Sequence, residues 1–158
     1  MPDHPLPVDI NAPAPLPVDT PRIKRMLDRH QTKIKISLKA CVHCSLCADS
    51  CFLYTTHNRK PRYMPAYKLI HSIGRLYKKK GRVDRACLEE IRDVVWKDCV
   101  LCTRCYCVCG IDIPGLLSLA RDICRSQGVC PDFGVPGSAA PGPANANLPA
   151  AVNSDTAA

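Results

Sequence analysis

A run of four cysteines with the spacing C-x2-C-x2-C-x3-C occurs twice in this chain and constrains the fold more than any other feature. The copies span residues 41–51 and 99–109. This spacing is typical of loops that hold a [4Fe–4S] cluster: three thiolates turn toward one cluster, and in two-cluster proteins the fourth ligates the other. The sequence therefore predicts two [4Fe–4S] clusters. The eight cysteines of the runs are Cys41, Cys44, Cys47, Cys51, Cys99, Cys102, Cys105 and Cys109.

Composition divides the chain into a central domain and two tails. Residues 1–21 hold seven of the fifteen prolines, and residues 131–158 hold five more without any Lys or Arg. Both segments are too poor in core-forming residues to offset the entropy of ordering, so we expect a Pro-rich disordered arm over 1–21 and an Ala/Pro-rich disordered tail or linker over 131–158. The folded domain is expected over residues 22–130. Its apolar core is small, and bound clusters would add stability because metal binding and folding are coupled.

The cysteine content also bears on the cellular compartment. Twelve cysteines would suit a secreted disulfide scaffold, but the Pro-rich N-terminus lacks the basic and then apolar regions of a secretory signal. No 18 consecutive apolar residues occur, so the sequence predicts no membrane span. Thiolates persist in reducing compartments, and we therefore expect a cytoplasmic protein.

Hydrophobic periodicity predicts an all-α fold. Helices are expected over about residues 21–31, 65–80, 83–97 and 114–128, with a shorter one from Leu46 through Tyr54. Residues 33–39 alternate polar and apolar side chains, which favours a short extended segment. The 47 residues between the two runs thus predict a helical hairpin, longer than the strand-containing link of small bacterial ferredoxins. The predicted architecture is two [4Fe–4S]-binding loops joined by this hairpin.

With the runs placed, residues 22–130 resemble the α-helical ferredoxin module. They are similar to the dicluster iron–sulfur subunit of heterodisulfide reductase and to the iron–sulfur part of related sulfate-reducer membrane complexes. The resemblance rests on the second run with its trailing Gly-Ile-Asp-Ile-Pro114, on Trp96 and on the helical spacer. It implies that one cluster is held by Cys41, Cys44, Cys47 and Cys109, and the other by Cys99, Cys102, Cys105 and Cys51.

The chain departs from these relatives in two ways. The proline that usually follows the fourth cysteine is missing, since Phe52 follows Cys51. The chain also lacks the Cys-Cys-Gly motif with which disulfide-reducing relatives hold a catalytic cluster. The resemblance therefore implies a relay subunit with no catalytic residue of its own. Its expected partners are a Cys-Cys-Gly-domain disulfide reductase, a flavoprotein or a membrane cytochrome subunit, which would place the chain peripherally on the cytoplasmic membrane face.

Other interpretations of the same residues stay open. The cysteines also suit a zinc-binding interaction module, although tetrahedral zinc would leave a third close cysteine of each run spare. A structural iron–sulfur protein is a further alternative, with the basic segment as its contact: residues 59–85 carry ten Lys or Arg and one acid, Asp84. That segment suits an acidic partner or anionic lipid, while sparse aromatics disfavour nucleic acid. Cys107, between two ligand positions, and Cys130, at the domain edge, have no assigned role.

Overall fold

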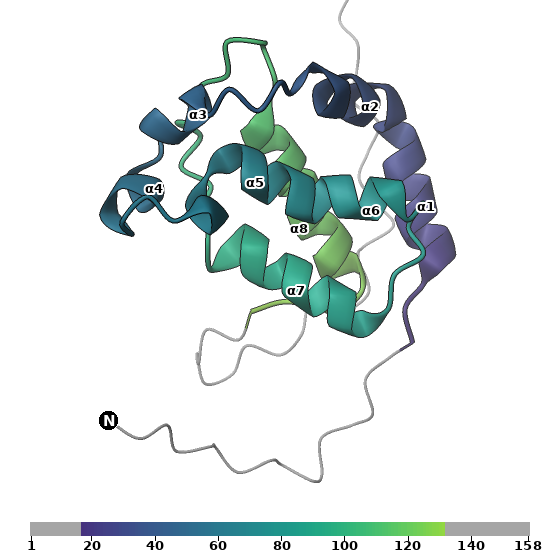
Figure 1. Ribbon diagram of the computed structural model, residues 1–158. Coiled ribbons are helices and arrows are strands. Elements are labelled where there is room, and N and C mark those ends of the chain that lie inside the picture. The colour runs from purple at the N-terminus through teal and green to yellow at the C-terminus, as the bar shows by residue number, and fades with distance from the viewer. Residues whose placement is uncertain (1–16, 132–158) are drawn as a thin grey trace, which may run out of the picture.

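The computed structural model describes residues 17–131, and every regular element in that range is a helix (Figure 1). The predicted all-α fold is confirmed. The disordered arm and tail predicted for residues 1–21 and 131–158 lie outside the described residues, apart from 17–21 and 131. Within the described range, no helix is both long and apolar enough to cross a bilayer.

The first two helices follow each other with a bend at His30. α1 (Thr20–Arg29) begins at the Asp19 cap, whose carboxylate accepts a 2.8 Å hydrogen bond from the Arg22 amide. α2 (Gln31–Ala40) occupies the segment predicted to be extended, so that prediction is wrong. Ile34 and Ser37 are buried three residues apart, as on a helix face, while Ile36 is 61% exposed. The alternating pattern of residues 33–39 suggests a strand only if all of its apolar residues are buried, and Ile36 is not.

Two short helices flank the end of the first cysteine run. α3 (Leu46–Asp49) and α4 (Phe52–Thr56) replace the single helix predicted there, because the chain is extended at Cys51, with φ −96° and ψ 104°. This break turns Cys51 away from the other cysteines of its run. A 3-10 turn, η1 (Pro61–Tyr63), leads into the next helix.

One long helix runs through the centre of the molecule (Figure 1). It comprises α5 (Pro65–Leu69), the π-helical turn η2 (Ile70–Gly74) and α6 (Arg75–Lys78). Its predicted end at Gly81 is confirmed: the Gly81 amide donates to the Leu76 carbonyl over 2.9 Å with φ 74°. A side chain at Gly81 would also place its Cβ 3.0 Å from Ile23 Cγ2, so glycine is needed there.

The remaining helices close the core around this central one. α7 (Arg85–Trp96) is capped by Asp84, and α8 (Ile113–Ser126) by Asp112. α7 packs on α8, and both contact η2. The core is built mainly from Leu69, Ile73 and Leu76 of the central helix, Leu88, Ile91 and Val95 of α7, and Leu117, Ala120 and Ile123 of α8.

Candidate iron–sulfur site

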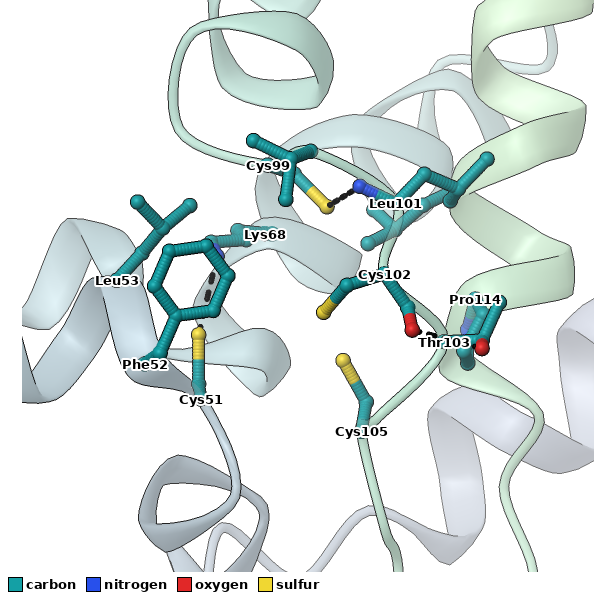
Figure 2. A pocket seen from close by; sticks show the side chains of 12 residues that line it. Cys51, Phe52, Leu53, Lys68, Cys99, Leu101, Cys102, Thr103, Cys105 and Pro114 are labelled. Atoms are coloured by element: carbon teal, nitrogen blue, oxygen red, sulfur yellow. Dashed lines mark hydrogen bonds between the residues drawn. The ribbon is translucent and has the colours of Figure 1, made fainter.

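The eight cysteines of the two runs line two cavities, and each cavity takes cysteines from both runs. What we call the first cavity is lined by Cys41, Cys44 and Cys47 together with Cys109 from the second run. The second cavity is lined by Cys99, Cys102 and Cys105 together with Cys51 from the first run. Figure 2 shows the sulfurs of these last four residues directed toward a common space. The arrangement is crossed: the fourth cysteine of each run lies in the cavity of the other.

Helices α4, α5 and α8 hold the two cavities in place. Cys51 lies at the start of α4, and Phe52 and Leu53 of that helix cover one side of the second cavity. α5 contributes Ala66 to the first cavity and Lys68 to the second, so this helix contacts both. The start of α8 likewise lines both cavities. It contributes Ile113 to the first, and Pro114 and Leu117 to the second.

The backbone of the two cysteine loops has the same unusual conformation at matching positions. In the first run His43 and Ser45 have φ values of 54° and 65°, and in the second run Leu101 and Thr103 have 53° and 63°. Leucine and β-branched threonine rarely adopt positive φ, and such conformations gather at functional sites. Residues of positive φ between right-handed ones can turn successive amide N–H groups to one side, as in an anion-binding nest. The Leu101 amide accordingly donates to Cys99 Sγ over 3.3 Å.

The chemistry of the thiols also fits a metal cluster. Cys47, Cys51 and Cys99 are buried, whereas Cys44, Cys102 and Cys109 are exposed. Burial, and secondarily the nearby thiols of Cys99 and Cys51, raises the pKa of Cys105 to about 12. Burial likewise raises the pKa of Cys47. A bound metal centre would offset this effect of burial, because it stabilises the thiolate form of its ligands.

The spacing of the side chains suits a group larger than a single ion. Within residues 17–131, no three His, Cys, Asp or Glu side chains converge closely enough to hold one metal ion. Four cysteines instead line each cavity, and in the second cavity their sulfurs are spread around a common space (Figure 2). A cubane with four iron corners requires such a spread arrangement of thiolates.

The second cavity contains a residue that sequence reasoning missed. Lys68 is 2% exposed, and its ammonium donates to Cys51 Sγ over 3.6 Å. Within residues 17–131, no carboxylate lies within 4.0 Å of it. Burying an unpaired ammonium costs several kcal/mol. A [4Fe–4S] cluster with four thiolates is anionic and would supply the missing countercharge, so Lys68 fits such a group as well as the cysteines do.

Lys68 leaves no signal in the sequence that separates it from a solvated lysine. On a helical projection of residues 65–80 it lies on the side away from the apolar stripe, where a lysine is expected to extend to solvent. In the structure α5 contacts α3, η1 and α8, so its polar side is covered as well.

Two arginines fix the entrance to the second run, and neither was predicted. Arg62 binds the buried carboxylate of Asp98, with its Nε 3.1 Å from both oxygens. Arg121 donates to the carbonyls of Val95, over 2.7 and 2.9 Å, and of Cys99, over 2.6 Å. These bonds join η1, α7 and α8 to the residue that opens the second run. Since the partners lie 22–36 residues apart, no local pattern reveals them.

The four cysteines outside the two proposed ligand sets, together with His43 and Trp96, lie partly at the first cavity and partly in or near the core. Cys107 lines the first cavity beside Cys109, and His43 lines it from an exposed loop position. Cys87 and Cys124 are buried in the core, and Cys130 is half-buried. Trp96 is half-buried and packs on the core, with the guanidinium of Arg121 5.3 Å from its ring centre.

Comparison with known proteins agrees with this geometry. Residues 37–113 match a protein-family model described as a 4Fe-4S dicluster domain. No curated protein and no solved structure matches the chain. The matched segment begins within α2, spans both cysteine runs and ends at the first residue of α8. The match supports an iron–sulfur module of the ferredoxin type that binds [4Fe–4S], and it supports an electron-transfer role.

Proposed function

We propose that this protein relays single electrons between redox partners through two [4Fe–4S] clusters, as a non-catalytic subunit of a heterodisulfide-reductase-like or respiratory complex. The observation that carries the proposal is the crossed arrangement of the cysteines, in which each run supplies the fourth thiol of the other's cavity. Each cluster, when bound, takes up and gives off one electron. A structural role would need only one cluster, whereas two cavities against the same helix suit a relay.

The proposed ligand sets follow the two cavities. Cys41, Cys44, Cys47 and Cys109 would hold the cluster in the first cavity, and Cys51, Cys99, Cys102 and Cys105 the cluster in the second. The Leu101 amide, which donates to Cys99 Sγ, would keep this hydrogen bond to a ligand sulfur, and such bonds raise the reduction potential. The core side chains of α5 and α8 would exclude water from the inner side of both cavities.

Exposed apolar residues gathered at the cysteine loops support docking of a partner protein. Every large apolar side chain identified as exposed within residues 17–131 lies in a cysteine run or within five residues of one. Five of these side chains also line one of the two cavities, and exposed apolar side chains gathered at one site mark interaction surfaces. We call this set the apolar collar. It consists of Ile36, Val42, Leu46, Phe52, Val100, Tyr106 and Val108.

The partner we favour is a redox subunit rather than a nucleic acid. The basic residues of segment 59–85 do not form one continuous surface. Arg59, Lys60 and Arg62 precede α5, whereas Lys78 to Arg82 follow at the other end of the central helix. Thirteen helical residues, Pro65 to Tyr77, separate the groups, a length of about 20 Å. Arg62 is moreover bound to Asp98. A relay subunit docked in this way would lie on the cytoplasmic face of the membrane as part of a complex.

The test is iron and sulfide analysis with EPR on the full chain, purified anaerobically and reduced stepwise. We expect about eight irons and eight sulfides per chain, and a reduced spectrum with two interacting spins. Colourless protein that holds zinc would overturn the electron-transfer role and favour a zinc module. Four irons with a single spin would overturn the relay and favour a structural iron–sulfur protein.

A further inference from the structure

The two cavities differ in charge, and the difference arises from one turn of α5. Lys68 lines the second cavity, whereas Ala66 of the same helix lines the first. Within the described chain, no Lys or Arg lines the first cavity. Its one titratable nitrogen belongs to His43, which is exposed to solvent. The two ligand sets have the same composition, so among the lining residues Lys68 is the charge that distinguishes the second cavity from the first.

The position of Lys68 gives its charge a strong local effect. The side chain is 2% exposed, and its ammonium donates to the sulfur of Cys51 over 3.6 Å (Figure 2). Phe52, Leu101 and Leu117 are among the apolar residues that line the same cavity. Charges interact more strongly in such surroundings than in water because screening is weak. The hydrogen bond also reaches a proposed ligand sulfur, and donors to ligand atoms tune the metal centre that those atoms hold.

We propose that Lys68 makes the second cavity the site that is reduced first, so that the cluster there has the higher potential of the two. This inference rests on the proposed relay. One electron from a low-potential donor adds one negative charge to the cavity, with no bond made or broken and no proton required. A fixed positive charge beside Cys51 stabilises the reduced form more than the oxidised form, because the reduced form is the more negative. The first cavity lacks such a charge and is reduced second.

The test is a potentiometric titration followed by EPR on the full-length, anaerobically purified holoprotein. Lys68→Met removes the charge and keeps an unbranched side chain, while Lys68→Arg keeps the charge. Lys78→Met, at an exposed lysine at the end of the same central helix, is the matched control. The signals are assigned with Cys44→Ser, which perturbs the first site, and Cys102→Ser, which perturbs the second.

We expect the second-site signal to appear first in the wild type. At the potential where that site is half reduced, Lys68→Met should lower its reduced-to-oxidised ratio at least tenfold, which is about 59 mV for a one-electron couple. The reduced-to-oxidised ratio at the first site should change less. Lys68→Arg, which keeps the charge, should retain most of the wild-type ratio at the second site. Lys78→Met should leave both sites unchanged.

Several results would overturn the inference. One is a wild type in which the signal perturbed by Cys102→Ser is the last to appear. Another is a Lys68→Met protein with full iron content and unchanged potentials. If Lys68→Met fails to assemble, Lys68→Gln, which retains a donor without the charge, is titrated in its place, and unchanged potentials in that variant would overturn the inference in the same way. Absence of iron from the wild type would instead overturn the proposed function.

Discussion

Cys107 and Cys109 lie two residues apart, and both line the first cavity. Either thiol is therefore placed to be the fourth ligand of the cluster proposed there. Cys109 is exposed, whereas Cys107 is half-buried and packs against the core. The run spacing assigns Cys109 as the ligand. We predict that Cys109→Ser lowers the iron content from about eight to about four per chain and removes one EPR signal, while Cys107→Ser keeps both.

Iron analysis and EPR of the two variants, prepared side by side, check this prediction. Cys87→Ser is a suitable reference because that thiol is buried away from both cavities. The opposite pattern, with iron lost from Cys107→Ser and kept by Cys109→Ser, would make Cys107 the ligand. Equal loss of iron from both variants would indicate that substitutions at residues 107 and 109 disturb the fold of this segment, without identifying either thiol as a ligand.

At the residue scale, the sequence predicts the candidate metal ligands better than it predicts the residues that surround them in the fold. The eight cysteines are predicted from spacing alone, since the C-x2-C-x2-C-x3-C run is typical of loops that hold a [4Fe–4S] cluster. Lys68 and Arg121 do not, because what they do depends on groups 17 and 26 residues away. A buried lysine and a solvated one look the same in a single sequence.

At the scale of elements, Asp112 joins α2 to the start of α8. Its carboxylate accepts from the Gly115 amide over 2.9 Å and from Lys33 Nζ over 2.6 Å. We predict that Asp112→Ala lowers the free energy of unfolding at pH 7 by about 1 kcal/mol, as the loss of a helix cap does. Denaturant unfolding followed by circular dichroism measures the change. Asp122→Ala, at an exposed position in the same helix, should change it by no more than a few tenths.

The same contacts set the pH dependence of this cap. The hydrogen bond from Lys33, followed by that from the Gly115 amide, lowers the pKa of Asp112 below its usual 3.8. A lowered folded-state pKa means that the stabilisation is fully present above about pH 4 and is lost as the pH falls through the folded value. Between pH 5 and 8 the difference between wild type and Asp112→Ala should therefore be constant. A difference that grows across this range would contradict the assignment.

Helices with a cap and a wide apolar stripe are predicted close to their bounds, as α7 and α8 illustrate. Asp84 and Asp112 precede them, and regular buried positions continue along them. α2 was missed because its neighbours, not its own pattern, decide that Ile36 stays exposed. The π-helical turn at Ile70–Gly74 also has no sequence signature. Local chemistry fixes helix ends, whereas packing decides which apolar residues are covered.

At the scale of the molecule, both cysteine runs lie on one side of the helical core, and the apolar collar lies with them. Side chains of this kind are ordinarily covered in a working complex. The exposed cysteines Cys44, Cys102 and Cys109 lie among them. These cysteines line the two cavities and reach solvent, so a partner docked beside them would bring its redox centre close to both proposed clusters.

We predict that Val42→Ser combined with Val100→Ser, at side chains 68% and 56% exposed, slows electron transfer to a co-purifying redox subunit at least tenfold. Truncating central apolar contacts of an interface costs about 1 kcal/mol or more each, and about 1.4 kcal/mol corresponds to tenfold in binding. Stopped-flow oxidation of the reduced protein by that subunit measures the rate. Oxidation by a small soluble acceptor should be unchanged, because it needs no docking surface.

The comparison between the two acceptors separates docking from damage to the site. Loss of rate with both acceptors, together with loss of iron, would mean that the substitutions disturb the cysteine loops. Lys78→Ser, at the end of α6 away from the collar, should change neither rate. If Lys78→Ser slows the protein partner as much as the collar variant does, the docking surface is the basic end of the central helix. The apolar collar would then face solvent or another subunit, and electrons would leave the chain by a longer path.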